Sequence, residues 1–379
     1  MKLKTTLFTI FAALILTACG SKGDEPPRPD DNVSRTLLVY MIADCDLGYN
    51  GWAERDLAEM RYAVDHGLNG GRVLVFHNAP GAHDRLVELM PDSTMREIVD
   101  YEGDGLSALS VERMKQVIAD SRREAPAAEY GLVVWGHGTG WIEETSSRSD
   151  GPQRSIGLSD GRRMKVTSFA EALTDTPFDW IYFDLCHLGV IEAVYELRHV
   201  AKTIVASTTE LPLEGMPYKE NLPHFFKPTA DLVAAAGSTY DYYMNSPEAT
   251  TRSCSIAVYD TEALDAFADA TAAIMAAAPK LPYNYKPIQY GRGSRSGTIF
   301  DMREYIMATD APQELKTAWD AAYDDLIVYT AATPTSYGFD MSKFTGLGSH
   351  IVETMDDVKL GYGNFQWWTD VVSKNPDLR

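Results

Sequence analysis

The chain of 379 residues has few cysteines and lacks the motifs that would assign them to disulfides or zinc. The four are Cys19, Cys45, Cys186 and Cys254, and no Cys-x-x-Cys or His-Glu-x-x-His sequence occurs. Disulfide scaffolds and common zinc sites need such patterns. If Cys19 is modified, the remaining odd number leaves at least one free thiol. We expect Cys45 and Cys254, which lie in or after apolar runs, to be buried free thiols.

Positive charge is also scarce, because 34 lysines and arginines face 54 aspartates and glutamates, giving a net charge of −20. Nucleic-acid partners require basic patches, so this balance argues against them. The charge is compatible both with simple solubility and with attraction of basic substrates, and composition leaves both interpretations open. The 45% hydrophobic content is that of an ordinary globular protein, which we expect to be a monomer.

The apolar run near the N-terminus is too short to span a bilayer. Residues 7–16 follow Lys2 and Lys4, which is the arrangement of a signal peptide. Residues 16–20 read Leu-Thr-Ala-Cys-Gly and resemble a bacterial lipobox. Residues 1–19 are therefore predicted to be a lipoprotein signal peptide, with Cys19 as the lipidated residue that anchors the protein to a membrane. Ordinary secretory cleavage after Ala18 is the alternative.

Residues 20–34 are polar, charged and rich in proline, which predicts a flexible tether. The acidic patch after Cys19 resembles surface-export signals of lipoproteins in some Gram-negative bacteria. We therefore expect a lipid-anchored protein of the bacterial cell envelope, at the outer membrane and exposed at the cell surface. The periplasmic face of that membrane is the alternative.

Apolar strand-like runs alternate with helical spacing over residues 35–215. Continuous apolar runs are typical of parallel strands that are buried on both faces, and five occur, at residues 36–43, 72–76, 130–135, 180–184 and 202–207. Residues 84–90 and 95–100 have the alternation of a hairpin. The pattern predicts an α/β fold, an αβα sandwich around a mostly parallel central sheet.

The regular alternation of strand-like and helical segments ends after residue 215. Residues 216–379 are predicted to be a mixed, mainly helical subdomain packed on the sheet. Spacing favours helices over residues 301–307, 314–330 and 356–369. Residues 138–165 are polar and rich in serine, glycine and arginine, so we expect a long loop there, of the kind that is usually functional.

Two strand ends carry the chemistry. Residues 132–138 read LVVWGHG and residues 181–187 read IYFDLCH, so His137 and Cys186 each follow an apolar strand. Ligands of open α/β sheets bind beyond the carboxyl ends of the strands, where these two side chains can meet. A histidine beside a cysteine can activate a thiolate nucleophile. We also expect the helix that follows Cys186 to favour the thiolate through its N-terminal dipole.

Other interpretations of these motifs are weaker. A lone histidine after a strand is usually a surface residue, and a cysteine at a strand end is usually core. The glycines at 136, 138 and 140 suggest a nucleotide loop, but the residues after them do not resemble the first turn of a helix. The Gly291–Gly297 segment lacks the Gly-Lys-Ser/Thr of a phosphate-binding loop.

Several segments together resemble the clostripain family of cysteine peptidases, which has a caspase-like fold. The resemblance rests on LLVYMIADCDL at residues 37–47, VVWGHGTGW at 133–141 and IYFDLCHLGVIEAVYELR at 181–198. It implies that Cys186 attacks the peptide carbonyl and that His137 protonates the leaving amine, with no third catalytic residue and no cofactor. The N–H groups of Gly138 and Cys186 would hold the oxyanion.

The resemblance also implies cleavage after arginine or lysine in peptide or protein substrates. A buried carboxylate is the physical requirement for that specificity. Asp184 matches the Asp-x-Cys position of the family and is the first candidate for the pocket floor. Glu210 and Glu214 follow the next strand and are the second candidates, with a solvated loop as their ordinary role.

Self-cleavage between histidine and cysteine is a further family property. In the polar stretch of residues 138–165, Arg148 and Arg154 are the candidate sites. Calcium dependence also occurs in the family, but no EF-hand spacing exists and its ligands stay unassigned. The oxygen donors that we consider are Asp44, Asp46, Asp100, Glu102 and Asp104.

The leading hypothesis is therefore a lipid-anchored cysteine endopeptidase made as a zymogen. A surface lipoprotein that uses the same fold for binding, with weak or absent catalysis, is the alternative, and the presence of both His137 and Cys186 favours the enzyme. A cysteine amidase or transpeptidase is a third hypothesis, distinguished by its products.

Overall fold

The computed structural model describes residues 33–140, 156–290, 298–359 and 361–378. These described residues belong to one compact unit. None of the helices described in these ranges is long and apolar enough to cross a membrane.

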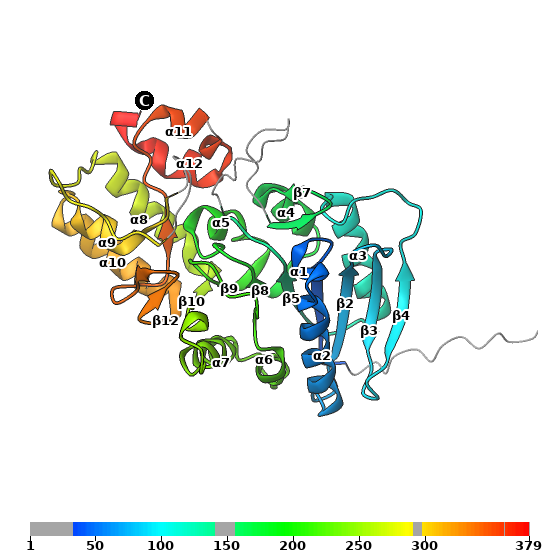
Figure 1. Cartoon of the computed structure of the whole chain (residues 1–379). Coiled ribbons are helices and arrows are strands. Elements are labelled where there is room, and N and C mark those ends of the chain that lie inside the picture. Colours follow the sequence, from blue (N-terminus) through cyan, green and yellow to red (C-terminus); the bar gives the residue numbers. More distant parts are fainter. Residues whose placement is uncertain (1–32, 141–155, 291–297, 360, 379) are drawn as a thin grey trace, which may run out of the picture. The chain divides into compact units, whose positions relative to one another are not determined.

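A nine-stranded sheet runs through the described part of the unit (Figure 1). The central strands β9, β8, β5, β1 and β2 are parallel, whereas β3, β4, β10 and β12 pair antiparallel with their neighbours. Their order across the sheet is β12 (Ile327–Ala332), β10 (Ser255–Asp260), β9 (Ala201–Ala206), β8 (Phe178–Asp184), β5 (Glu129–Trp135), β1 (Arg35–Ile42), β2 (Arg72–Asn78), β3 (Arg85–Leu89) and β4 (Met95–Asp100).

Strand β1 explains why both faces of this sheet need cover. All eight of its residues are buried, as the continuous apolar run predicts. Successive side chains point to opposite faces, so Leu38, Tyr40 and Ile42 belong to one core, while Leu37 and Val39 belong to the other. The predicted α/β class, with a mostly parallel central sheet, is confirmed.

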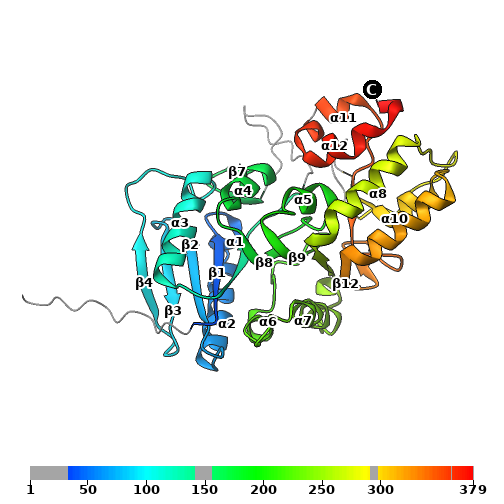
Figure 2. The same cartoon turned by 180° about the vertical axis from the view of Figure 1, so that it is seen from behind.

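Helices cover both faces, as the two opposite views show (Figures 1 and 2). The core on one side includes α1 (Asp46–Tyr49), α2 (Trp52–Asp65), α6 (Tyr218–Phe225) and α7 (Leu232–Met244). The other core includes α3 (Val111–Glu124), α4 (Val166–Leu173), α5 (Ile191–Glu196), α8 (Leu264–Ala276), α9 (Met302–Ala308), α10 (Gln313–Leu326) and α12 (Gln366–Asp370).

The segment after residue 215 contributes to the same sheet. Strands β10 and β12 extend it beyond β9, and the tail adds α11 (Met355–Lys359). Three small two-stranded sheets complete the described structure, and they pair β6 (Ile156–Ser159) with β7 (Arg162–Met164), β11 (Phe300–Asp301) with β15 (Gly348–Ser349), and β13 (Thr335–Ser336) with β14 (Phe339–Asp340).

Three local predictions need correction. The helix expected over residues 314–330 ends at Leu326, because the β-branched residues that follow form β12 on the sheet edge. The helix expected over 356–369 is divided into α11, a 3₁₀ helix at Tyr362–Asn364 and α12, and Gly361 follows the first break at φ 107°. The loop expected over 138–165 ends in the β6–β7 hairpin.

Candidate active site

Three neighbouring parallel strands end together and bring the candidate residues to one edge of the sheet. Trp135 at the end of β5 is in register with Met41 of β1 and with Asp184 of β8. His137 therefore follows β5 at the same edge where Cys186 follows β8. Both side chains line one pocket, as the strand-end argument predicts.

Glycines allow the histidine loop to pack directly against the cysteine turn. A Cβ atom added to Gly138 would lie 2.3 Å from the carbonyl oxygen of Cys186, and one added to Gly140 would lie 2.3 Å from that of His187. Gly136 begins the loop at φ 145°, a conformation that side chains disfavour. The backbone of Gly138, a predicted oxyanion donor, thus lies beside the backbone of Cys186.

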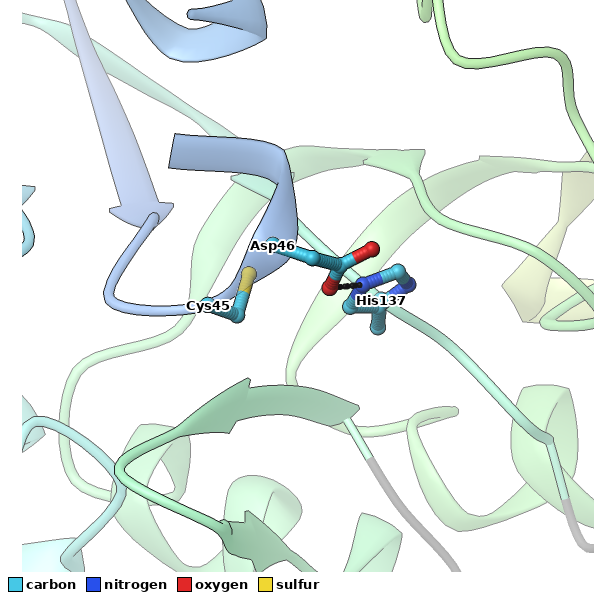
Figure 3. Close-up of side chains that lie close together, drawn as sticks. All are labelled: Cys45, Asp46 and His137. Atoms are coloured by element: carbon cyan, nitrogen blue, oxygen red, sulfur yellow. Dashed lines mark hydrogen bonds and ion pairs between the residues drawn. The ribbon is translucent and has the colours of Figure 1, made fainter. Parts of the chain in front are cut away.

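The imidazole of His137 has a carboxylate partner (Figure 3). Its Nε2 lies 2.7 Å from Oδ1 of Asp46, which follows β1 at the start of α1. Cys45 is buried next to this pair, and ligand atoms of the three side chains lie within 4.8 Å of one another. Asp46 was considered from the sequence only as an oxygen donor for calcium.

The thiol of Cys186 is half-buried and lies against the segment after β9. The backbone N–H of Leu211 donates a hydrogen bond to Sγ at 3.3 Å. Burial, together with the nearby charges of Glu210 and Asp184, raises the pKa of this thiol to about 12. The thiolate expected from a helix dipole is therefore not favoured, because α5 begins only at Ile191.

His187 holds the turn that follows Cys186 in shape. It adopts φ 60°, which is uncommon for a side chain other than glycine. Its backbone N–H donates to the carbonyl of Thr209 at 3.1 Å, and its Nδ1 lies 3.1 Å from the carbonyl oxygen of Thr208. These contacts fasten the turn to the segment after β9.

Asp184 lies on the wall of the pocket, at the end of β8, and is 4% exposed. Its carboxylate accepts hydrogen bonds from the backbone N–H of Met216 and the hydroxyl of Tyr218, each at 2.9 Å. Burial raises its pKa to about 6. A Cβ added to Gly215 would lie 2.9 Å from the carboxylate, so this glycine permits the close approach.

The pocket has a cavity volume of about 50 Å³, enough for about two water molecules. Apolar side chains and backbone make up most of its wall. The lining residues are Leu47, Trp135, Gly136, His137, Asp184, Leu185, Cys186, Leu211, Pro212, Leu213 and Gly215.

A second buried carboxylate lies behind this wall. Asp56 of α2 is 1% exposed and accepts a hydrogen bond from the indole N–H of Trp135 at 2.7 Å. Its Oδ1 has no hydrogen-bond partner among the described residues. Burial, together with the charge of Asp184, raises the pKa of Asp56 to about 9, so the side chain is protonated at neutral pH.

Glu210 and Glu214 lie on the loop that supplies part of the pocket wall, but neither is among the lining residues. Glu210 is exposed, and its carboxylate is 4.0 Å from Nε2 of His187. Their role in specificity stays a prediction. Cys19, Arg148 and Arg154 lie outside the described residues.

The candidate calcium donors do not gather into one group. Asp100 and Glu102 form an exposed cluster with His83, whereas Asp104 pairs with the buried Arg113. Asp44 and Asp46 follow β1, and the carboxylate of Asp46 contacts His137. Cys45 and Cys254 are buried free thiols, as predicted.

Sequence reasoning missed Asp46 as a partner of His137, and it missed Asp56 and the pocket-lining residues Leu211, Pro212, Leu213 and Gly215. A signal existed for Asp46, since it follows an apolar strand just as His137 and Cys186 do. No signal marked Asp56, because an aspartate in an amphipathic helix ordinarily faces solvent.

Comparison with known proteins agrees with this geometry. The sequence matches the model of the clostripain family over residues 39–355. The chain belongs to the clostripain family. It is a cysteine peptidase whose substrates are peptides or proteins.

Solved structures of such peptidases resemble this chain. An inactive zymogen of a C11 protease from Parabacteroides distasonis is 25% identical, has a TM-score of 0.72, and the match covers 90% of this chain and 98% of that one. A secreted C11 cysteine protease from Bacteroides thetaiotaomicron, in complex with an irreversible peptide inhibitor, is also 25% identical. Its TM-score is 0.76, with 89% of this chain and 99% of that chain covered. No protein matched in the search of curated proteins.

Proposed function

We propose that this peptidase is an endopeptidase that cleaves after arginine or lysine, with Cys186 as nucleophile and His137 as general base and acid. The observation that carries the proposal is the shared pocket at the ends of β5 and β8, which is lined by His137, Cys186 and the buried Asp184. A buried carboxylate is the partner that a guanidinium or ammonium group requires when it leaves water.

The reaction follows from these groups. His137 takes the proton of the Cys186 thiol as sulfur attacks the peptide carbonyl carbon, and the oxyanion accepts hydrogen bonds from the N–H groups of Gly138 and Cys186. Collapse breaks the C–N bond, and the imidazolium gives its proton to the leaving amine. His137 then takes a proton from water as the oxygen attacks the thioester carbonyl. The C–S bond breaks, the peptide carboxylic acid leaves, and the imidazolium returns its proton to the sulfur of Cys186.

The decisive test uses protein that begins after Cys19, with fluorogenic peptides that end in Arg, Lys, Asp or Leu. We expect turnover after Arg or Lys and none for Cys186→Ala, while Cys254→Ala, which removes another buried thiol, keeps it. Asp184→Asn should raise KM for the basic peptides about 10-fold or more, since an ionic hydrogen bond is lost. No turnover with any peptide, together with a Cys186 inert to iodoacetamide, would favour a binding lipoprotein.

The zymogen hypothesis has its own test. Self-cleavage at Arg148 or Arg154 predicts two fragments of the active protein on a denaturing gel and a single band for Cys186→Ala. Two bands from that variant would show that another protease makes the cut.

Membrane anchoring through Cys19 is part of the proposal and rests on the lipobox-like sequence. Cells that express the full chain should incorporate labelled palmitate into it, and Cys19→Ser should not. Digestion of the protein on intact cells by added protease would support exposure at the surface, whereas protection would indicate the periplasmic face.

A further inference from the structure

The contact between Asp46 and His137 joins a third strand to the site. Asp46 follows β1, which lies between β5 and β2 in the sheet. The carboxylate Oδ1 and the imidazole Nε2 are 2.7 Å apart, the distance of a charge-assisted hydrogen bond. The side chain of Asp46 is 61% exposed and that of His137 is 28% exposed, so the pair lies at the mouth of the pocket.

We propose that Asp46 is a positioning residue that fixes the tautomer and the orientation of His137 during peptide cleavage. The inference rests on the proposed function and deepens it, because it adds a third member to a Cys–His pair that was expected to act alone.

Elementary chemistry fixes the direction of the hydrogen bond. An ionised carboxylate only accepts, so Nε2 of His137 carries a proton and donates it. In the neutral ring Nδ1 is then the unprotonated nitrogen, the one available to take a proton from Cys186. When Nδ1 gains that proton, the imidazolium is balanced by the carboxylate on its other side.

The thiol makes such help necessary. Burial and the nearby carboxylates keep the pKa of Cys186 high, so the thiol does not ionise by itself at neutral pH. A base must remove its proton during attack, and a base that is held in one tautomer is ready in every encounter.

The fold holds Asp46 in place. The N–H of Ala43 donates to the carbonyl of Asn78 at 2.9 Å, and the N–H of Cys45 donates to the carbonyl of Ala43 at 2.8 Å. A Cβ added to Gly48 would lie 2.0 Å from the carbonyl oxygen of Ala43, so α1 packs tightly back on the end of β1. The buried Cys45 precedes Asp46 and anchors this turn.

Kinetics of variants test the proposal. Asp46→Asn should lower kcat about 10- to 100-fold, because a poorly oriented general base loses that part of its contribution to the rate. KM for the basic peptide should stay unchanged. Asp46→Glu should restore part of kcat. The matched control is Glu54→Gln, which removes an exposed carboxylate from the next helix, α2, and should leave both constants unchanged. An unchanged kcat for Asp46→Asn would overturn the proposal, as would a loss confined to KM.

Nitrogen NMR gives a readout that does not depend on turnover. The experiment uses Cys186→Ala protein labelled with ¹⁵N-histidine. The ring signals of His137 are identified by their loss in a His137→Gln variant. They should show the tautomer that is protonated at Nε2. Adding Asp46→Asn should abolish that preference. If Asp46→Asn left the tautomer unchanged, positioning by Asp46 would be refuted. If the tautomer shifted as expected but the wild-type protein cleaved none of the peptides, only the proposed function would be refuted.

Discussion

Asp56→Asn should stabilise the protein at neutral pH, although it alters a residue that is 1% exposed. Burial raises the pKa of Asp56 in the folded protein to about 9, whereas the pKa of an aspartate in an unfolded chain is about 3.9. Between these values the folded protein binds a proton that the unfolded chain does not. Stability therefore falls as the pH rises from about 4 to about 9.

The magnitude follows from linkage. pH 7 is about three units above the unfolded value, and each unit corresponds to about 1.4 kcal/mol, so keeping Asp56 protonated costs about 4 kcal/mol. Asparagine carries no titrating proton, and its side-chain oxygen can still accept the hydrogen bond from Trp135. We expect a gain of about 2–4 kcal/mol in unfolding free energy at pH 7, which vanishes near pH 4.

Urea unfolding at pH 4.5, 5.5, 7 and 8, followed by tryptophan fluorescence, measures this gain. Glu54→Gln on the same helix removes an exposed carboxylate and is the control, which should show no comparable trend with pH. If the stability difference for Asp56→Asn were independent of pH, or if the variant were less stable at pH 7, Asp56 would be ionised in the folded protein and the reasoning would be wrong.

Three further predictions concern the pocket. The value of kcat/KM for basic peptides should fall as the pH drops below about 6, because Asp184 then gains a proton. Tyr218→Phe should move this fall to higher pH, because the hydroxyl stabilises the ionised carboxylate. pH profiles with basic and leucine peptides test both expectations. Gly138→Ala should reduce kcat about 100-fold without unfolding the protein, since the added methyl would displace the Cys186 carbonyl; activity and thermal melting together check it. Methylguanidinium should speed alkylation of Cys186 by iodoacetamide, because it offsets the Asp184 charge that disfavours the thiolate, and Asp184→Asn should lose the effect.

The elements that were predicted best from the sequence are those whose type, strand or helix, is determined by burial alone. Strand β1 is a continuous apolar run because helices cover both of its faces, and the run is visible without any partner. Strand β12 was mistaken for the end of a helix because its identity depends on pairing with β10, far away in the chain. Contacts of that range leave no local periodicity.

The same distinction holds for the site. His137 and Cys186 were predicted to meet because each follows a parallel strand, and the registers of β5 and β8 bring their ends together. The neutral state of the Cys186 thiol could not be predicted, since it arises from burial and from charges that only the folded chain assembles. The distance from Cys186 to the start of α5 likewise became known only from the structure.

The closeness of Asp184 and Cys186 links specificity to reactivity. Both line one pocket, and the carboxylate that is proposed to bind a basic side chain also disfavours the thiolate. An empty pocket therefore keeps the nucleophile protonated, whereas a substrate cation offsets the opposing charge as it binds. Part of the binding free energy of a basic side chain would then appear as a faster reaction of the thiol, which is how an enzyme converts recognition into catalysis. An apolar side chain in the same pocket would leave the charge of Asp184 in place, so it would be the poorer substrate in kcat as well as in KM.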